Sequence, residues 1–394
     1  MTGDHLAILG GSPAFPNGLR LLKPTLPPLD AVLPGLHKAF ASGVLTKGPA
    51  LAEYERRVAA HLGVRHALGV SSCTAGLTLL LSRFGGGEAV MPSFTFMATA
   101  MAAARAGLTP VFADIDPDTW CLSPARAEAA ISERTAVIVP VHLFGAPADT
   151  DAFDELGRRC GVPVIYDAAH GFGALRDGRP VGRQGLAQVF STSPTKLLIT
   201  GEGGVVATDD DEVARFVVVG REYGNPGDYD ALFVGTNARL PEAEALLGTA
   251  SLELLEAEAA RRNELAAVYH RELAGLPGLS WQRIRRQDRT SYKDISVRVG
   301  APFGLTRDQL AETLAHEGIE TRAYYVPTVH RLTAFAHLHD RYDGLLPQTD
   351  ALAAEVLTLP LYGSLAHDDV RRVAASIRAA QEHAAAIRRA LGEV

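Results

Sequence analysis

Between residues 66 and 210, short apolar runs alternate with helical stretches, and this alternation constrains the fold more than any other feature of the sequence. The apolar runs are 66–72, 88–94, 109–115, 135–145, 162–169, 186–193 and 203–210. The helical stretches between the first five runs are 74–84, 96–106, 123–132 and 150–160. Runs rich in Val and Ile are typical of strands buried on both faces, so the alternation predicts a mostly parallel sheet flanked by helices. The last two runs lie too close together for a helical crossover and either turn back or join the sheet in another order.

The sequence before this region predicts an extended arm and a helix. Residues 1–30 are rich in Gly, Pro and Leu and show no clear period, which is typical of an arm lying on the body of the protein. A helix is expected over 49–62, because Pro49 stands at its first position and Gly63 where a C-cap belongs.

After residue 210 the pattern changes to that of a smaller α+β unit. The expected elements are a long helix over 240–273, a strand at 295–299, a helix at 306–317, extended segments at 321–326 and 356–362, and a final helix from Ala366. We therefore predict an α/β protein with an N-terminal arm (1–30), a large domain (31–255) and a small C-terminal domain (256–394).

Charge and cysteine usage exclude several classes of protein. The 38 Lys and Arg residues against 45 Asp and Glu residues give a net charge of −7, which does not attract nucleic-acid phosphates. The nearest approach to a basic run, 283–289, holds four Arg with an Asp among them and is interpreted as a solvated loop. No apolar stretch approaches the roughly 18 residues of a membrane span. The cysteines (Cys73, Cys121 and Cys160) are odd in number and far apart, which argues against disulfides and a metal site and favours a cytoplasmic enzyme.

Two charged residues at predicted strand ends are candidates for chemistry. Asp167 ends the run VPVIYDAAH, where a carboxylate is costly to bury without a cation or donor, and His170 follows three residues later. A helix N-cap or a turn is the simpler interpretation of such an Asp. Lys196 is flanked by three apolar residues (197–199), and desolvation lowers the pKa of a lysine and frees its amine for Schiff-base formation.

Other segments suit a phosphate and a flat ring. Ser72, Cys73 and Thr74 lie at a strand-to-helix junction, where free backbone N–H groups bind phosphate, although ordinary helix capping explains the same residues. Ser191 ends another strand, and Phe96 is a candidate apolar face for a ring. No GxGxxG opens a helix after the first strand, which argues against a dinucleotide site.

The order of these features, namely phosphate turn, aromatic, Asp, Ser and Lys, matches what pyridoxal phosphate requires. The sequence also resembles the DegT/DnrJ/EryC1/StrS family of sugar aminotransferases, which have the fold-type I architecture. The resemblance runs through nearly the whole chain and is carried by LTKGP (45–49), SSCTAGL (71–77), MPSFTF (91–96), PVFADIDPDT (110–119), VHLFG (141–145), YDAAHGFG (166–173), FSTSPTKLLITGEGG (190–204), GTNARL (235–240) and YYVPTVHRLTAF (324–335).

The resemblance implies a role for each residue at a matching position. Lys196 would hold the cofactor covalently and move a proton, Asp167 would pair with the ring nitrogen, and His170 would lie near the ring hydroxyl. Phe96 would stack on the ring. The phosphate would be bound by Ser72, Cys73, Thr74, Ser191 and, from the partner subunit of a homodimer, Asn237.

The same resemblance implies the reaction and the substrates. L-glutamate would donate the amino group, and a keto-sugar nucleotide would accept it, with dTDP-4-keto-6-deoxyglucose aminated at C4 as the expected acceptor. A 3-keto sugar nucleotide or a keto-cyclitol is the alternative. Lys293, Tyr324, Tyr325 and His330 are candidates for substrate contacts by position, although the two tyrosines and the histidine equally suit core packing.

The sequence departs from the family pattern at three positions and leaves two other classes open. Lys293 stands where His or another polar residue is more usual. Cys73 stands where Gly is usual, and Ser193 where many members have His three residues before the lysine. A nicotinamide-dependent oxidoreductase and a non-catalytic regulatory protein with the same fold stay as alternatives, but Lys196 and Asp167 are those of a transaminase.

Overall fold

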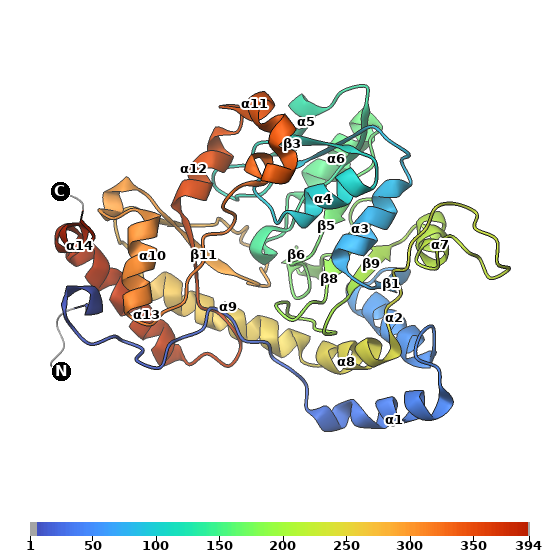
Figure 1. Ribbon diagram of the computed structural model, residues 1–394, viewed down its shortest axis with the longest axis horizontal. Coiled ribbons are helices and arrows are strands. Elements are labelled where there is room, and N and C mark those ends of the chain that lie inside the picture. Colours follow the sequence, from blue (N-terminus) through green and yellow to red (C-terminus); the bar gives the residue numbers. More distant parts are fainter. Residues whose placement is uncertain (1–5, 393–394) are drawn as a thin grey trace.

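A central mixed sheet organises the computed structural model, which describes residues 6–392 (Figure 1). Its strands run in the order β3-β2-β4-β5-β8-β9-β1, because isolated bridges from Ile138 to Val164 and from Val141 to Asp167 join a three-stranded and a four-stranded part. The strands are β1 (His66–Val70), β2 (Glu88–Pro92), β3 (Thr109–Ala113), β4 (Thr135–Ile138), β5 (Ile165–Asp167), β8 (Ala187–Ser191) and β9 (Gly204–Thr208).

The direction of the strands confirms the prediction of a mostly parallel sheet. Strands β2, β3, β4, β5 and β8 run parallel to one another, and β9 runs antiparallel to its neighbours β8 and β1. The last two apolar runs therefore turn back on each other, with Ser191 opposite Gly204. A side chain at Gly204 would meet the backbone nitrogen of Cys73 at 2.6 Å, so β9 needs a glycine where it passes beneath the next helix.

Helices cover both faces of the sheet, as the βαβ pattern predicts. Met91 and Val189 point into one apolar cluster, and their neighbours Val90 and Phe190 point into the clusters on the other face. The helices of this part are α2 (Pro49–Leu62), α3 (Cys73–Ser82), α4 (Ala98–Arg105), α5 (Pro124–Ala130), α6 (Thr150–Cys160) and α7 (Asp211–Gly220).

Helix α2 has the predicted bounds, and its start is fixed by a residue far along the chain. Pro49 occupies its first turn, and the Glu242 carboxylate accepts hydrogen bonds from the backbone N–H groups of Gly48, Ala50 and Leu51. A carboxylate at a helix N-terminus satisfies donors that have no partner within the helix.

The C-terminal part packs around its own three-stranded sheet of order β10-β11-β12. The N-terminal arm belongs to the same apolar cluster through Leu6, Phe15 and Leu19, and Leu19 bridges to Ile319. In Figure 1 the arm runs from this lobe along the foot of the molecule to α1. The elements are α1 (Leu33–Ser42), α8 (Glu242–Leu252), α9 (Leu255–Glu272), β10 (Leu279–Trp281), β11 (Ile295–Val299), α10 (Arg307–His316), α11 (His339–Tyr342), α12 (Pro347–Glu355), β12 (Val356–Leu359), α13 (His367–Glu382) and α14 (Ala384–Ala390).

The division into arm, large domain and small domain remains a proposal, with a boundary near the start of α9. Residues 1–5 of the predicted arm lie outside the described residues. The segment around Val329 and Phe335 leaves the small lobe and packs into a cluster of the large sheet. None of the helices within 6–392 is both long and apolar enough to cross a bilayer.

Three predicted elements are wrong in detail. The long 240–273 helix is two helices, α8 and α9, separated at Glu253–Leu254. Ser251, just before the break, accepts the N–H of Ile199 through its hydroxyl. Gly248, Thr249 and Ser251 have weaker helix preferences than their neighbours. The final helix is interrupted at His383, and residues 321–326 form one bridge at Arg322 and then a turn, not a strand.

Candidate active site

A cavity of about 390 Å³ lies where the carboxyl ends of β5 and β8 meet the start of α3. Parallel neighbouring strands end on the same edge of a sheet, so residues distant in sequence converge there. The predicted residues that line it are Ser72, Cys73, Thr74, Phe96, Asp167, His170, Ser191, Lys196, Lys293, Tyr324 and Tyr325. The lining residues that sequence reasoning did not single out as site residues are Ala98, Ala169, Ser193, Thr195, Glu202 and Arg322.

Asp167 is a buried carboxylate held in a fixed orientation. Thr99 donates from Oγ1 to Asp167 Oδ2 at 2.7 Å, and the backbone N–H of Ala169 donates to Oδ1 at 3.0 Å. Burial raises the pKa of Asp167, whereas these two donors and the charge of Lys196 act in the opposite direction. The strand end therefore presents an acceptor that a cationic ring nitrogen would stabilise in its charged form.

Lys196 follows the end of β8 and faces the same cavity. The three residues after it, 197–199, are almost fully buried, as its apolar flanks predict. Burial, followed by the nearby charge of Lys293, lowers the pKa of Lys196 to about 8. A sizeable fraction of the amine is thus neutral near pH 8, which is the form that attacks a carbonyl carbon.

The first turn of α3 supplies backbone donors at one end of the cavity. Ser72 is the N-cap and accepts the Ala75 N–H through Oγ, while the N–H groups of Cys73 and Thr74 stand in the turn where a helix has no acceptor of its own. Cys73 turns its thiol inward, 3.4 Å from the Val189 carbonyl oxygen and 4.0 Å from Asp167 Oδ1. Burial raises the pKa of Cys73 well above its usual value, so the thiol is a packing group here.

His170 is held in the cavity wall by its backbone. Its carbonyl oxygen accepts a hydrogen bond from Ser291 Oγ at 2.8 Å, whereas its buried Nδ1 has no partner among the described residues. Burial, and then the charges of Lys196 and Lys293, lower the pKa of His170 well below its usual value. A neutral imidazole with an unsatisfied buried nitrogen is suited to a polar group of a bound ligand.

The opposite wall combines aromatic rings with two cations. Phe96 lies at the rim, 52% exposed, with its ring 6.3 Å from that of Tyr325. The Tyr324 ring has Lys293 Nζ at 5.4 Å and Arg322 Cζ at 5.8 Å from its centroid. Lys293 is buried and paired with both carboxylate oxygens of Asp294, at 2.9 and 3.0 Å, whereas Arg322 is exposed.

Two predicted site residues lie outside the cavity. Asn237 is exposed and bridges to Glu222 in the segment that follows α7, so this chain's own Asn237 does not reach its own cavity. His330 is fully buried, with Nδ1 2.7 Å from Ser93 Oγ and Nε2 3.3 Å from Asp350 Oδ1. His330 does not line this cavity, and its position fits core packing, the alternative interpretation. Its contact with substrate stays a prediction.

The residues of the cavity fit pyridoxal phosphate. A buried carboxylate, a buried amine of lowered pKa, a partnerless imidazole nitrogen and free N–H groups at a helix start all face one space of suitable size. Within the described part of the chain, no group of three or more His, Cys, Asp or Glu side chains is placed to hold a metal ion.

Comparisons with known proteins assign the chain to a family. A family model described as the DegT/DnrJ/EryC1/StrS aminotransferase family matches residues 31–378. A solved structure of DesI in the presence of its TDP-sugar product is 37% identical, with a TM-score of 0.88, over 95% of this chain and 96% of that one. DesV of S. venezuelae, in complex with a ketimine intermediate, is 33% identical, with a TM-score of 0.84, over 93% of this chain and 98% of its own.

A curated relative carries a different kind of name. A Geobacillus stearothermophilus protein called "Pleiotropic regulatory protein" is 34% identical over 352 residues, which are 88% of this chain and 94% of that protein. The family match decides between the classes that the sequence left open, in favour of an aminotransferase and against a nicotinamide oxidoreductase. With its fold, its cavity and a family match over most of its length, the chain belongs to the DegT/DnrJ/EryC1/StrS aminotransferase family and is a pyridoxal-phosphate-dependent sugar aminotransferase.

Proposed function

We propose that the enzyme transfers the amino group of L-glutamate to a keto-sugar nucleotide, dTDP-4-keto-6-deoxyglucose, at C4. The observation that carries this proposal is one cavity in which Lys196 and Asp167 face a wall bearing the cations Lys293 and Arg322. The likeness to DesI, whose structure contains a TDP-sugar product, supports the choice of acceptor.

Lys196 is the residue that we propose holds and moves the proton. Bound pyridoxal phosphate supplies an electron-accepting ring that stabilises negative charge on the carbon that loses its proton. The Lys196 amine, with its pKa lowered to about 8, can take a proton from the donor carbon as a neutral base and deliver it as an ammonium group. The buried residues that follow Lys196, 197–199, keep bulk water from that side of the amine.

Asp167, His170 and the α3 turn orient the cofactor in this proposal. The Asp167 carboxylate would pair with the ring nitrogen, and the partnerless His170 Nδ1 would contact the ring hydroxyl. The N–H groups at the start of α3, with the hydroxyls of Thr74 and Ser191, would bind the phosphate. Phe96 at the rim would cover one face of the ring.

The aromatic wall gives a physical reason for anionic substrates. Arg322 is exposed at the cavity and has one ion pair, with Glu320 at 3.7 Å, which contributes little at an exposed site. A guanidinium in this position suits both the carboxylate of glutamate and the diphosphate of a sugar nucleotide. Tyr324, held between Lys293 and Arg322, and its neighbour Tyr325 would then contact the sugar.

A homodimer completes the proposal. The segment after α7 extends away from the body in Figure 1 and exposes Tyr229 and Val234 almost fully, with Leu232 also exposed. Exposed apolar groups that gather on one segment are typical of an interface, and Asn237 follows directly. We expect a cytoplasmic enzyme that sediments as a dimer. Val234→Asp should weaken the association of the two subunits. A wild-type monomer that binds its cofactor fully would exclude the shared site.

A visible spectrum tests the reaction itself. L-glutamate should remove the visible absorption band of the lysine-linked cofactor, and dTDP-4-keto-6-deoxyglucose should restore it. Lys196→Ala should abolish turnover while still retaining cofactor without a covalent link, and Asp167→Asn should lower the rate by several orders of magnitude. Multiple turnover by the Lys196→Ala enzyme would refute the assignment of the lysine.

The same spectrum separates the alternatives. If glutamate removes the band but the 4-keto sugar does not restore it, transamination would be supported and the proposed acceptor would be wrong. A 3-keto sugar nucleotide and a keto-cyclitol would then be tried in turn. A band that glutamate leaves unchanged would favour a regulatory protein that retains the fold.

A further inference from the structure

The basic run at 283–289 is not the simple solvated loop that its sequence suggests. Arg289 and Leu175 exchange two backbone hydrogen bonds, of 2.8 and 3.0 Å, and the Arg283 N–H donates to the Asp118 carbonyl oxygen at 2.8 Å. The carboxylate of Asp288 is buried and lies 3.2 Å from Arg176 Nη1. The loop is therefore fastened at both ends to the large domain.

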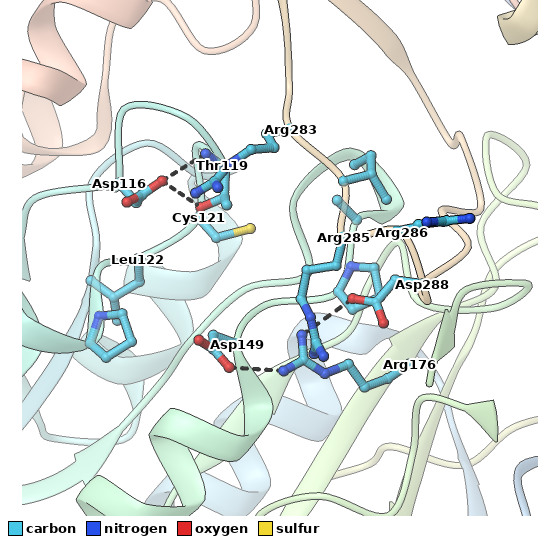
Figure 2. Close-up of a pocket in the computed structure, with 14 residues that line it drawn as sticks. Asp116, Thr119, Cys121, Leu122, Asp149, Arg176, Arg283, Arg285, Arg286 and Asp288 are labelled. Atoms are coloured by element: carbon cyan, nitrogen blue, oxygen red, sulfur yellow. Dashed lines mark hydrogen bonds and ion pairs between the residues drawn. The ribbon is translucent and has the colours of Figure 1, made fainter. Parts of the chain in front are cut away.

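A second cavity of about 480 Å³ lies under this loop and is larger than the cofactor cavity (Figure 2). The two cavities share no lining residue. Its lining combines apolar side chains, from Leu122, Pro124, Ala146, Pro147 and Ile284, with charged ones, from Asp116, Asp149, Arg176, Arg283, Arg285, Arg286 and Asp288. Apolar walls with a few directed polar groups are typical of small-molecule sites.

The fixed charges in the wall of the second cavity are already paired. Arg176 is almost fully buried and contacts Asp149 at 2.9 Å and Asp151 at 2.8 Å, besides Asp288. Asp116 accepts three hydrogen bonds through Oδ1, from Asp118 N, Thr119 N and Thr119 Oγ1. These groups shape the cavity. Three aspartates share the one arginine, so this part of the wall keeps a net negative charge that the arginines of the loop offset.

The arginines of the loop are different, because their partners are exposed. Figure 2 shows Arg283 and Arg285 extending from the loop over the cavity. Arg283 pairs with Asp118 at 3.3 Å and Arg285 with Asp177 at 3.3 Å, and all four side chains are at least 41% exposed. Exposed ion pairs contribute little to stability, so a ligand anion can replace the aspartates as partners of these arginines.

We propose that this cavity is a second binding site, for a nucleoside phosphate whose base lies on the apolar floor and whose phosphate oxygens contact Arg283 and Arg285. Guanidinium forks match phosphate oxygens in geometry and charge, whereas a floor of proline, leucine and isoleucine suits a flat base better than a polyhydroxylated sugar. The proposal concerns a cavity outside the active site and does not depend on the identity of the amino acceptor.

Trp120 stands beside the second cavity and reports on its occupancy, whereas Trp281 packs against the His270 ring, 4.4 Å away between centroids, in the C-terminal lobe. Trp120 lies between Thr119 and Cys121, which line the cavity, and its ring makes an edge contact with Phe144 at 6.5 Å. Phe144 in turn stacks on Tyr325 of the cofactor cavity at 5.9 Å, so the rings of Trp120 and Phe144 connect the surroundings of the two sites.

The test is a titration of the cofactor-loaded enzyme with dTDP, followed by intrinsic tryptophan fluorescence and by calorimetry. The double variant Arg283→Gln/Arg285→Gln should weaken the fluorescence-detected binding by at least about tenfold for each guanidinium removed. The matched control Arg215→Glu, an exposed arginine on α7 beside the opposite edge of the sheet, should bind as the wild type does. Turnover of the double variant without dTDP should be unchanged.

Further arms separate this site from the active site and from a general anion site. Arg322→Gln should leave the fluorescence change in place, because Arg322 lines only the cofactor cavity. Thymidine and inorganic pyrophosphate should each bind much more weakly than dTDP. Three outcomes would overturn the proposal. The fluorescence change could be lost in Arg322→Gln but kept in the double variant, dTDP could fail to bind at all, or pyrophosphate could bind as tightly as dTDP.

Discussion

Thr99 Oγ1 lies 2.7 Å from Asp167 Oδ2 and joins the first turn of α4 to the end of β5. The hydroxyl also lies 3.0 Å from Thr95 Oγ1, so Thr99 belongs to a buried polar set beneath the cavity. Because the hydrogen bond favours the charged carboxylate, it opposes the rise that burial causes in the pKa of Asp167.

Thr99→Val should therefore lower kcat by roughly tenfold to a hundredfold, since a hydrogen bond to a charged group contributes about 1.5–3 kcal/mol. Asp167 would bind a proton more readily and hold the cofactor less firmly. Steady-state kinetics at several cofactor concentrations measure both effects. Thr99→Ser keeps the hydroxyl and should restore most of the activity, and a Val variant of normal activity would show that the contact is only structural.

Burial of Lys196 should make the stability of the cofactor-free protein rise with pH. The pKa of Lys196 falls from 10.5 to about 8 on folding, so between these values the unfolded chain binds more protons than the folded one. The folded state is thus disfavoured below pH 8 and gains about 3 kcal/mol as the pH rises toward 10.5.

Urea unfolding at pH 7.5 and 10 measures this gain. Lys196→Met removes the titrating amine but keeps the volume of the side chain, so its stability should change less with pH than that of the wild type. Comparing the two proteins cancels the titration of the tyrosines and cysteines that they share. Identical pH dependence in both would contradict a lowered pKa for Lys196.

Arg322→Gln should raise KM for the amino acceptor by about tenfold while changing kcat little. Arg322 is an exposed residue in the cavity lining, where it would bind the substrate without taking part in the proton transfer. Arg322→Lys keeps the charge without the fork and should give an intermediate KM. High salt should raise the KM of the wild-type enzyme but affect the Gln variant less. If the KM values for glutamate and for the acceptor are both unchanged, Arg322 does not contact either substrate.

His330→Ala should act on stability more than on substrate binding. The side chain is fully buried against Ser93, and its loss leaves that hydroxyl without its ring partner, which should lower the free energy of unfolding by about 1–3 kcal/mol. Burial lowers the pKa of His330, in keeping with a neutral ring. Denaturant unfolding and KM are measured on the same preparation. A large rise in KM with an unchanged free energy of unfolding would show that His330 contributes to substrate binding.

Local patterns were sufficient to predict most of the elements and the two central site residues. The Val- and Ile-rich runs became strands because each has enough apolar surface to be covered on both faces. Asp167 and Lys196 could be recognised because a charge at the end of such a run, or between apolar residues, is costly unless it has a partner.

The features that were missed depend on contacts between distant segments. Arg322 precedes two tyrosines in a stretch that looks extended, and only the turn after it brings it to the cavity. Thr99 resembles any buried helix residue until Asp167 lies beside it. The break between α8 and α9 escaped notice because the apolar spacing continues across it, and the position of His330 depends on Ser93, from the end of β2.

The antiparallel placement of β9 has a consequence for folding of the chain during its synthesis on the ribosome. Strand β1 emerges before all others, yet its one ladder partner among the described strands is β9, whose residues are made last in the sheet. At the usual rate of roughly 5–20 residues per second, β1 remains without a neighbour for about ten seconds or more. The N-terminus of helix α2 acquires its acceptor later still, because the carboxylate that binds its N–H groups belongs to Glu242. These two early elements of the nascent chain therefore acquire their native surroundings late.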